Sequence, residues 1–233
     1  MVKLAAKCIV AGDPAVGKSA LVQMFCNDGA HFQKNYTLTA GVELLVKTVP
    51  VPETSDSVEL FIFDSAGKEL FSEMLEKLWE QPNAMCIVYD VTNEQSFNNC
   101  AKWLERLRTQ TSGIHIPGVL VGNKTDLIDR RVVEWKQAQE WAETNGLEYC
   151  EISVKEMENY EDPFHIVANS FHQLYKEKVE SFHSLVNCLW EQNSYLLQSM
   201  SSICILMAGR VNFLGLKCYL TSCKTIYLRF QKL

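Results

Sequence analysis

The sequence predicts an α/β fold with a mostly parallel six-stranded sheet, one antiparallel edge strand and helices on both faces. Short apolar runs, most of them bounded by Gly, Pro, Asp or Asn, alternate with segments of helical periodicity. This alternation is typical of parallel sheets whose strands are joined by helices. One further segment alternates in polarity and leads through a turn-rich link into the next strand, which predicts a hairpin and an antiparallel edge.

Each element is assigned from its local pattern. The predicted buried strands are Cys8–Ala11, Leu60–Phe63, Met85–Tyr89, Val119–Gly122 and Tyr149–Ile152. The predicted helices are Ser19–Cys26, Glu69–Trp79, Phe97–Leu107, Val133–Thr144 and Phe164–Phe182. The edge strand lies within Gly41–Val51, and residues 50–56 form the link that follows it. Because ligands of such sheets bind beyond the carboxyl ends of the strands, we expect the chemistry in the loops after them.

The composition argues against several classes of protein. The 233 residues carry a net charge of −6, whereas a nucleic-acid-binding protein is expected to have a basic stripe. The nine cysteines include no C-x-x-C pair, so we expect free thiols in a reducing compartment. Met1–Leu4 does not resemble the start of a secretory signal, and Cys223 lies too far from Leu233 for prenylation. We therefore expect no nucleic-acid partner, no secretion and no lipid anchor.

The character of the chain changes towards its C-terminal end. From residue 187 onward there are five basic residues and one acidic residue, a net charge of +4. We expect a single domain over residues 1–184 and a poorly ordered extension over residues 185–233. A membrane-spanning helix over Ile203–Leu220 is the alternative. Arg210 and Lys217 argue against it, since each costs about 2.5–3.5 kcal/mol at the centre of a spanning helix.

Residues 12–19 read Gly-Asp-Pro-Ala-Val-Gly-Lys-Ser and stand between the first predicted strand and the first predicted helix. They match the phosphate-binding pattern G-x-x-x-x-G-K-S, in which backbone N–H groups and a helix N-terminus converge on an anion. Lys18 can reach the terminal phosphates, and the Ser19 hydroxyl can bind Mg²⁺. A chance match in an ordinary loop is the alternative. The expected nucleotide contacts are Gly12, Asp13, Pro14, Ala15, Val16, Gly17, Lys18, Ser19 and Ala20.

A second strand is followed by Asp64-Ser65-Ala66-Gly67. Asp64 can orient the Mg²⁺ shell through water, because Mg²⁺ keeps several of its waters. Gly67 allows the backbone to approach a γ-phosphate closely. Taken alone, this tetrapeptide is explained equally well as an ordinary turn.

A third strand is followed by Asn123-Lys124-Thr125-Asp126. The Asp126 carboxylate can accept hydrogen bonds from two N–H groups of guanine, a donor pair that adenine lacks, and such a site can reject an analogue by about 10⁴ or more. Lys124 can lie over the base, and Asn123 can tie this loop to the phosphate-binding loop. A turn that opens a helix is the alternative. Further N–H groups that could bind the guanine carbonyl belong to Ser153, Val154 and Lys155.

The polar segment between the first helix and the edge strand contains Phe32, Tyr36 and Thr39. Thr39 could complete the Mg²⁺ shell only while a γ-phosphate holds this segment in place, which would make the segment an order–disorder switch. For Thr39 an ordinary loop position is the alternative, and for Phe32 a core anchor.

With these stretches in this order, residues 3 to about 183 resemble the Ras-superfamily small GTPases, which have a P-loop NTPase fold, and among them the Rab branch. The spacing of Tyr36 and Thr39 looks like the Rab switch I, and Tyr89-Asp90-Val91-Thr92 matches the Rab segment after the fourth strand. The resemblance implies binding of GTP, GDP and Mg²⁺. It also implies Ser19 and Thr39 as metal ligands, Asp64 acting through water and Phe32 against the guanine edge. The guanine motif argues against a P-loop kinase as an alternative.

Lys68 departs from the family pattern, because it occupies the position of the catalytic glutamine. That glutamine orients the attacking water, whereas an ammonium group has three donors and no acceptor. We therefore expect a weak GTPase with slow hydrolysis. Pro14 is a second departure, since it removes one N–H from the phosphate-binding loop.

In residues 64–74, and in the expected lack of a prenylation site, the chain resembles the Rab-like GTPases of ciliary transport. This resemblance implies a subunit of the intraflagellar transport B complex that pairs with a small β-sandwich subunit and with other subunits of that complex. It places the protein in the cilium and the cytoplasm near the basal body, with only indirect membrane contact. The alternative is an interaction subunit in which the nucleotide only stabilises the fold.

Overall fold

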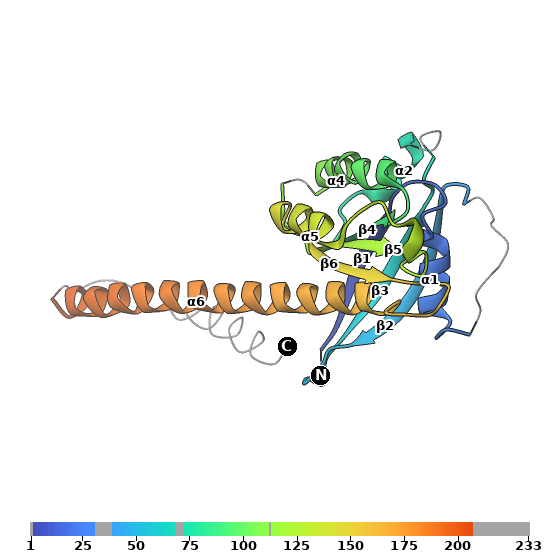
Figure 1. Ribbon diagram of the computed structural model, residues 1–233. Coiled ribbons are helices and arrows are strands. Elements are labelled where there is room, and N and C mark those ends of the chain that lie inside the picture. The colour runs from blue at the N-terminus through green and yellow to red at the C-terminus, as the bar shows by residue number, and fades with distance from the viewer. Residues whose placement is uncertain (1, 31–38, 69–71, 112, 207–233) are drawn as a thin grey trace. The chain divides into compact units, whose positions relative to one another are not determined.

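The computed structural model describes residues 2–30, 39–68, 72–111 and 113–206, with the backbone alone over 72–73 and 187–206. The chain divides into two units, Met1–Glu177 and Lys178–Leu233. The first unit contains a six-stranded sheet with the strand order β2-β3-β1-β4-β5-β6 (Figure 1). The predicted α/β fold with one antiparallel edge strand is confirmed.

All six predicted strands are present, and their observed bounds match or differ by a few residues from the predicted ones. They are β1 (Lys3–Ala11), β2 (Val42–Pro50), β3 (Ser57–Ser65), β4 (Ala84–Asp90), β5 (Gly118–Asn123) and β6 (Glu148–Ile152). The edge strand β2 pairs antiparallel with β3, and the remaining neighbours pair parallel. The carboxyl ends of the parallel strands therefore meet along one edge of the sheet, where the loops with the predicted motifs begin.

The helices differ from the prediction at two places. The described helices are α1 (Lys18–Cys26), α2 (Ser72–Trp79), α3 (Glu94–Asn98), α4 (Cys100–Thr109), α5 (Trp135–Thr144), α6 (Asp162–Leu206) and the short 3₁₀ helix Ile128–Arg130. The helix predicted over Phe97–Leu107 is wrong as one element. Asn93 caps the earlier α3 by accepting a hydrogen bond from the Ser96 N–H, and Asn99 separates α3 from α4.

Helix α6 is the second difference, because it runs well past the predicted end at Phe182. Residues 185–206 contain no Gly and no Pro, so nothing in their backbone chemistry stops the helix. None of the described helices has the length and apolar character needed to cross a membrane. Residues 207–233 lie outside the described residues, and the poor order expected for 185–233 stays a prediction.

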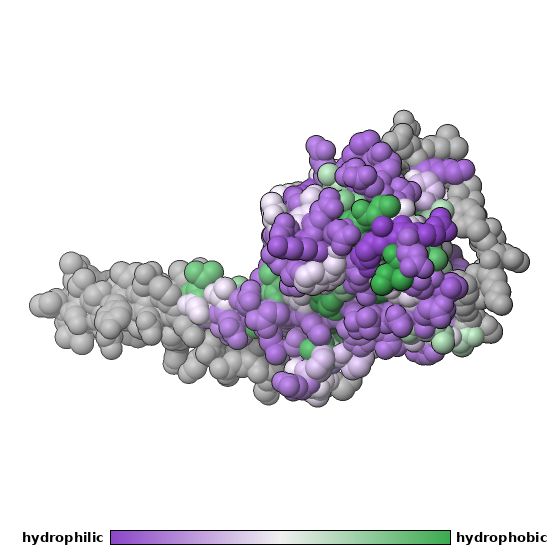
Figure 2. Space-filling model, in the orientation of Figure 1, coloured by the Kyte–Doolittle hydropathy of each residue, from purple (hydrophilic) through white to green (hydrophobic). Residues whose placement is uncertain are grey.

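Two apolar cores cover the two faces of the sheet. Figure 1 shows the helices that lie on these faces. One core joins the sheet to α1 and to the first turns of α6, and it includes the stacked rings of Phe25 and Phe164. The other joins it to α2, α3, α4 and α5, and it includes the tryptophans Trp79 and Trp103. The visible face in Figure 2 is mostly hydrophilic, with small hydrophobic patches. Burial of the two apolar faces therefore fixes the sheet edge that carries the loops.

The Phe25–Phe164 stack is expected to carry much of the packing of α6 on the sheet. The ring centroids are 4.1 Å apart, and Phe164 is fully buried. Phe164→Ala should lower the free energy of unfolding by about 3–5 kcal/mol, because it leaves a cavity. Phe182→Ala in the same helix removes the same ring from a 57% exposed position and should change it by less than about 0.5 kcal/mol. Urea denaturation measures both changes, and equal losses would contradict the assignment of the core.

Candidate nucleotide-binding site

The loop between β1 and α1 has the form that the phosphate-binding pattern predicts. Gly17 is the N-cap of α1 and has φ +104, a conformation that favours glycine. A Cβ atom at Gly17 would lie 2.2 Å from Nδ2 of Asn123, so the site also leaves no room for a side chain. The N–H groups in the first turn of α1 have no acceptors within the helix. They are available to an anion at this point.

Lys18 lies across this loop. It is 6% exposed, and its Nζ donates to the carbonyl oxygens of Gly12 at 2.8 Å and Asp13 at 2.7 Å. Burial lowers the pKa of Lys18 to about 8, although the carboxylates of Asp64 and Asp13 oppose that change. The structure thus places one cationic group on the loop that leads into the N–H donors of α1.

Asp64, Ser19 and Thr39 bring together oxygen atoms of the kind that bind Mg²⁺. The Asp64 side chain is buried, and neither of its oxygens has a hydrogen-bond partner among the described residues. Burial raises the pKa of Asp64 to about 6, while the neighbouring Ser19 hydroxyl and the Lys18 ammonium group act in the opposite direction. The hydroxyl oxygens of Ser19 and Thr39 are 2.8 Å apart. A buried carboxylate with unused oxygens next to two hydroxyls fits the preference of Mg²⁺ for oxygen ligands and water.

Gly67 lies directly against the phosphate-binding loop. A Cβ atom at Gly67 would be 2.4 Å from the backbone nitrogen of Pro14, so only glycine permits this contact. Next to it, Lys68 is exposed and lines a cavity of about 380 Å³. The other residues that line this cavity are Asp13, Pro14, Gly67, Asn99, Lys102, Trp103 and Arg106. The position of the family glutamine therefore lies beside the loop, as the motif predicts.

The Asp13 side chain takes part in a contact that sequence reasoning missed. Its carboxylate accepts hydrogen bonds from Nδ2 of Asn99 at 2.7 Å and from Nε1 of Trp103 at 2.8 Å. The carboxylate therefore fastens the loop to α4, and only the backbone of Asp13 is left for the predicted nucleotide contact. No local pattern could have revealed this, because the partners lie about ninety residues further along the chain, at separations of 86 and 90.

Asn123 makes the predicted tie to the phosphate-binding loop and extends it to a third loop. Its Nδ2 donates to the carbonyl oxygen of Val16 at 2.8 Å. Its Oδ1 accepts from the backbone N–H of Lys124 at 2.8 Å and from that of Val154 at 3.4 Å. The loops after β1, β5 and β6 are thus joined through a single side chain that is 2% exposed.

Asp126 lies beside the loop after β6. It accepts hydrogen bonds from Oγ of Ser153 at 2.9 Å and from Nζ of Lys155 at 3.2 Å. Burial acts to raise the pKa of Asp126, but these two hydrogen bonds outweigh it and hold the pKa below its usual value. Asp126 is therefore an ionised acceptor at neutral pH.

Two of the three N–H groups predicted to bind a guanine carbonyl, those of Ser153 and Val154, already donate hydrogen bonds within the protein. The N–H of Ser153 donates to the Glu158 carbonyl at 3.0 Å, and that of Val154 donates to Asn123. Their predicted role would require them to exchange these bonds. Phe32 and Tyr36, the other predicted contacts, lie outside the described residues.

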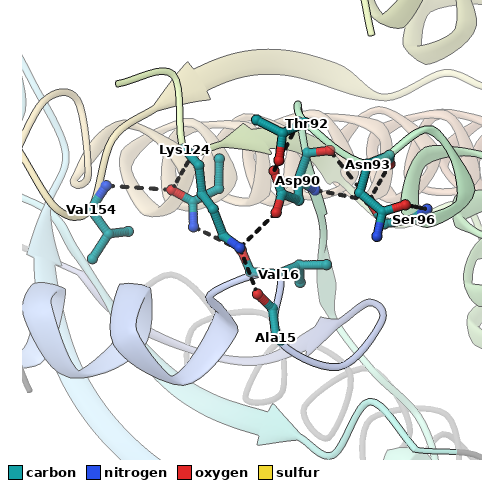
Figure 3. Close-up of polar contacts among 9 residues, drawn as sticks. Ala15, Val16, Asp90, Thr92, Asn93, Ser96, Lys124 and Val154 are labelled. Atoms are coloured by element: carbon teal, nitrogen blue, oxygen red, sulfur yellow. Dashed lines mark hydrogen bonds and ion pairs between the residues drawn. The ribbon is translucent and has the colours of Figure 1, made fainter. Parts of the chain in front are cut away.

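Lys124 bridges two elements of the site. Its Nζ donates to the Ala15 carbonyl at 2.9 Å and pairs with Oδ2 of Asp90 at 2.6 Å (Figure 3). Asp90 was noticed in the sequence only as part of a Rab-like segment. Its place next to Lys124 follows from the pairing of β4 with β5, in which Asp90 lies opposite Asn123.

Comparison with known proteins agrees with these observations. The model of the Ras family matches residues 7–173. The intraflagellar transport protein 27 homologs of Mus musculus and Homo sapiens are 73% and 72% identical, over 80% and 79% of this chain and the whole of each relative. Intraflagellar transport protein 27 of Chlamydomonas reinhardtii is 39% identical over 77% of this chain and 90% of its own length.

The family match runs from within β1 into α6, so it includes all the loops that build the site. The resemblance that the motifs predicted is confirmed, and the chain belongs to the Ras family.

Proposed function

We propose that this protein is a Rab-like GTPase that binds GTP or GDP together with Mg²⁺, hydrolyses GTP slowly and acts in intraflagellar transport. The observation that carries the proposal is the pair of Ser19 and Thr39 hydroxyls beside the buried carboxylate of Asp64, whose oxygens have no hydrogen-bond partner within the part of the chain that the structure describes. Ras-family proteins bind guanine nucleotides, generally with Mg²⁺, and the donor set at this position suits that metal.

Each part of the site has its own role in this proposal. Ser19 and Thr39 would hold the metal directly and Asp64 through water, and the bound ion would neutralise charge on the phosphate oxygens. Lys18 and the N–H groups at the start of α1 bind the phosphates. Because Thr39 belongs to the segment before β2, its contact with Ser19 connects that segment to the state of the phosphates.

Lys68 is the reason to expect slow chemistry. Its ammonium group can pair with a phosphate oxygen, which stabilises the bound ground state, but it has no acceptor with which to orient water. The GTP-bound state would therefore persist much longer than in a relative with glutamine at this position.

The partners are inferred from the names of the relatives. We infer a place in the intraflagellar transport B complex, next to a small β-sandwich subunit, in the cilium and the nearby cytoplasm. The second candidate function, an interaction subunit with a structural nucleotide, is favoured by Lys68. Partner affinity measured in the GDP and GTP states separates the two, because a switch requires unequal affinities.

The direct test is the identity of the nucleotide that purified protein releases when it is denatured. Chromatography should find GDP or GTP in a ratio near one per chain, and adenine nucleotides or none would contradict the proposal.

Asp126→Asn should change the preferred base from guanine to xanthine. An amide can donate to the extra carbonyl of xanthine, but it cannot accept from both N–H groups of guanine. The affinity for GDP should fall by about 10³ or more, and that for xanthosine diphosphate should rise. Competition against a fluorescent nucleotide measures both affinities. Retention of the wild-type preference would show that Asp126 does not contact the base.

Lys68→Gln should accelerate single-turnover hydrolysis of GTP, by about tenfold or more, because it restores a side chain that can orient water. Lys102→Gln, which replaces another lysine that lines the same cavity, is the matched control and should leave the rate unchanged. The prediction is wrong if Lys68→Gln hydrolyses GTP no faster than the wild type.

Asp64→Asn should stabilise the protein without nucleotide and metal while weakening its response to Mg²⁺. Burial raises the pKa of Asp64 in the folded protein to about 6, so ionising this group lowers the free energy of unfolding. This loss of stability is absent well below the unfolded pKa, near 4, and reaches its full value well above pH 6. The variant should therefore gain up to about 3 kcal/mol at pH 7.5 and about 1 kcal/mol at pH 4.5. Denaturation at both pH values in EDTA measures the gain. A loss of stability at pH 7.5, with Mg²⁺ still slowing nucleotide release, would refute this role.

A further inference from the structure

We propose that Asp90 is a positioning residue for the guanine nucleotide, which holds Lys124 in place and thereby connects the base-binding loop to the phosphate-binding loop. The inference rests on the proposed function, and it concerns a residue outside the motifs that suggested that function. Its basis is the bridge in Figure 3, in which Nζ of Lys124 lies between Oδ2 of Asp90 at 2.6 Å and the Ala15 carbonyl at 2.9 Å.

Both loops that this bridge joins have strained backbones. Ala15 has φ 61 and Lys124 has φ 72, a region that is unfavourable for residues with a Cβ atom. Such conformations persist only where the surroundings determine them, and they gather at functional sites. Here one hydrogen bond, from Nζ of Lys124 to the Ala15 carbonyl, connects the two strained residues directly. The position of the Lys124 ammonium group therefore matters to both loops.

Asp90 is itself held rigidly, as a positioning residue must be. Its Oδ1 accepts from the backbone N–H of Thr92 at 2.8 Å and from the Thr92 hydroxyl at 2.7 Å. Its backbone N–H donates to Oγ of Ser96 at 3.0 Å, and Ser96 lies in the capped helix α3. One carboxylate oxygen thus serves the local turn, and the other is directed at Lys124 (Figure 3).

The ion pair is buried enough to restrain the Lys124 side chain. The side chain of Asp90 is 11% exposed and that of Lys124 is 32% exposed, so water screens this pair less than it screens an exposed pair. Without Asp90 the Lys124 ammonium group keeps only the Ala15 carbonyl as a partner in the bridge, and its long side chain regains rotamer freedom. The Lys124 side chain would then be less well ordered for contact with a bound base, and the residence time of the nucleotide would become shorter.

The test is the rate at which mant-GDP leaves the full-length protein in excess GDP and Mg²⁺. Asp90→Asn keeps the size of the side chain and an acceptor for Thr92 but removes the charge, and release should be about tenfold faster, equivalent to about 1.4 kcal/mol. Thr92→Val, which keeps the ion pair and removes one bond to the carboxylate, should give a smaller acceleration. Asp56→Asn, at the pair with His172 in the β2–β3 link, is the matched control and should leave the rate unchanged.

A double-mutant cycle separates positioning from a general loss of structure. Lys124→Met should also accelerate release, and Asp90→Asn should add nothing in that background if it acts through Lys124. An equal effect of Asp90→Asn with and without Lys124 would overturn the proposal, as would an unchanged release rate. Wild-type protein that takes up no mant-GDP would overturn the proposed function and this inference together, whereas wild-type binding with an insensitive Asp90 overturns the inference alone.

Discussion

The side-chain amide of Asn123 is the contact on which the whole site depends. It donates to the loop after β1 and accepts from the loops after β5 and β6. An amide has separate donor and acceptor ends in a fixed geometry, so no aspartate or leucine could make both kinds of bond. The same side chain fills the space in front of Gly17, which explains why the loop has no room for a Cβ atom there. The sheet brings three strand ends together, and this amide sets their spacing.

Two buried charged groups, Lys18 and Asp64, are consistent with the proposed binding of nucleotide and metal. Burial lowers the pKa of Lys18 and raises that of Asp64, so each group is held in surroundings that disfavour its charged form. They attract each other, but neither oxygen of Asp64 has a hydrogen-bond partner among the described residues. Phosphates next to Lys18 and a cation shell next to Asp64 would offset both penalties. The nucleotide and the metal should therefore contribute to folding stability as well as to activity.

The sequence contained enough to predict the succession of strands along the chain and the loops after them, because buried strands and the phosphate and guanine motifs are local patterns. It could not predict which side chains meet across loops. Trp103 donates to Asp13 over a separation of 90 residues, and Asp90 meets Lys124 only because β4 pairs with β5. The split between α3 and α4 was also hidden. An apolar stripe at helical spacing continues through Asn99, while the helix does not.

Slow chemistry changes which residues control the lifetime of the GTP-bound state. When hydrolysis is fast, the residue that orients water sets that lifetime. If Lys68 slows hydrolysis as proposed, loss of the nucleotide would compete with its cleavage, and the contacts that hold the base would become decisive. The proposed role of the ion pair between Asp90 and Lys124 would then affect the switch through residence time rather than through catalysis. A partner that displaced this pair from outside would act as an exchange factor, whereas one that supplied an acceptor beside Lys68 would act as an activator. The two regulatory routes would therefore act on neighbouring residues of the same phosphate-binding loop, since Gly67 next to Lys68 lies against Pro14 and Lys124 bonds the Ala15 carbonyl.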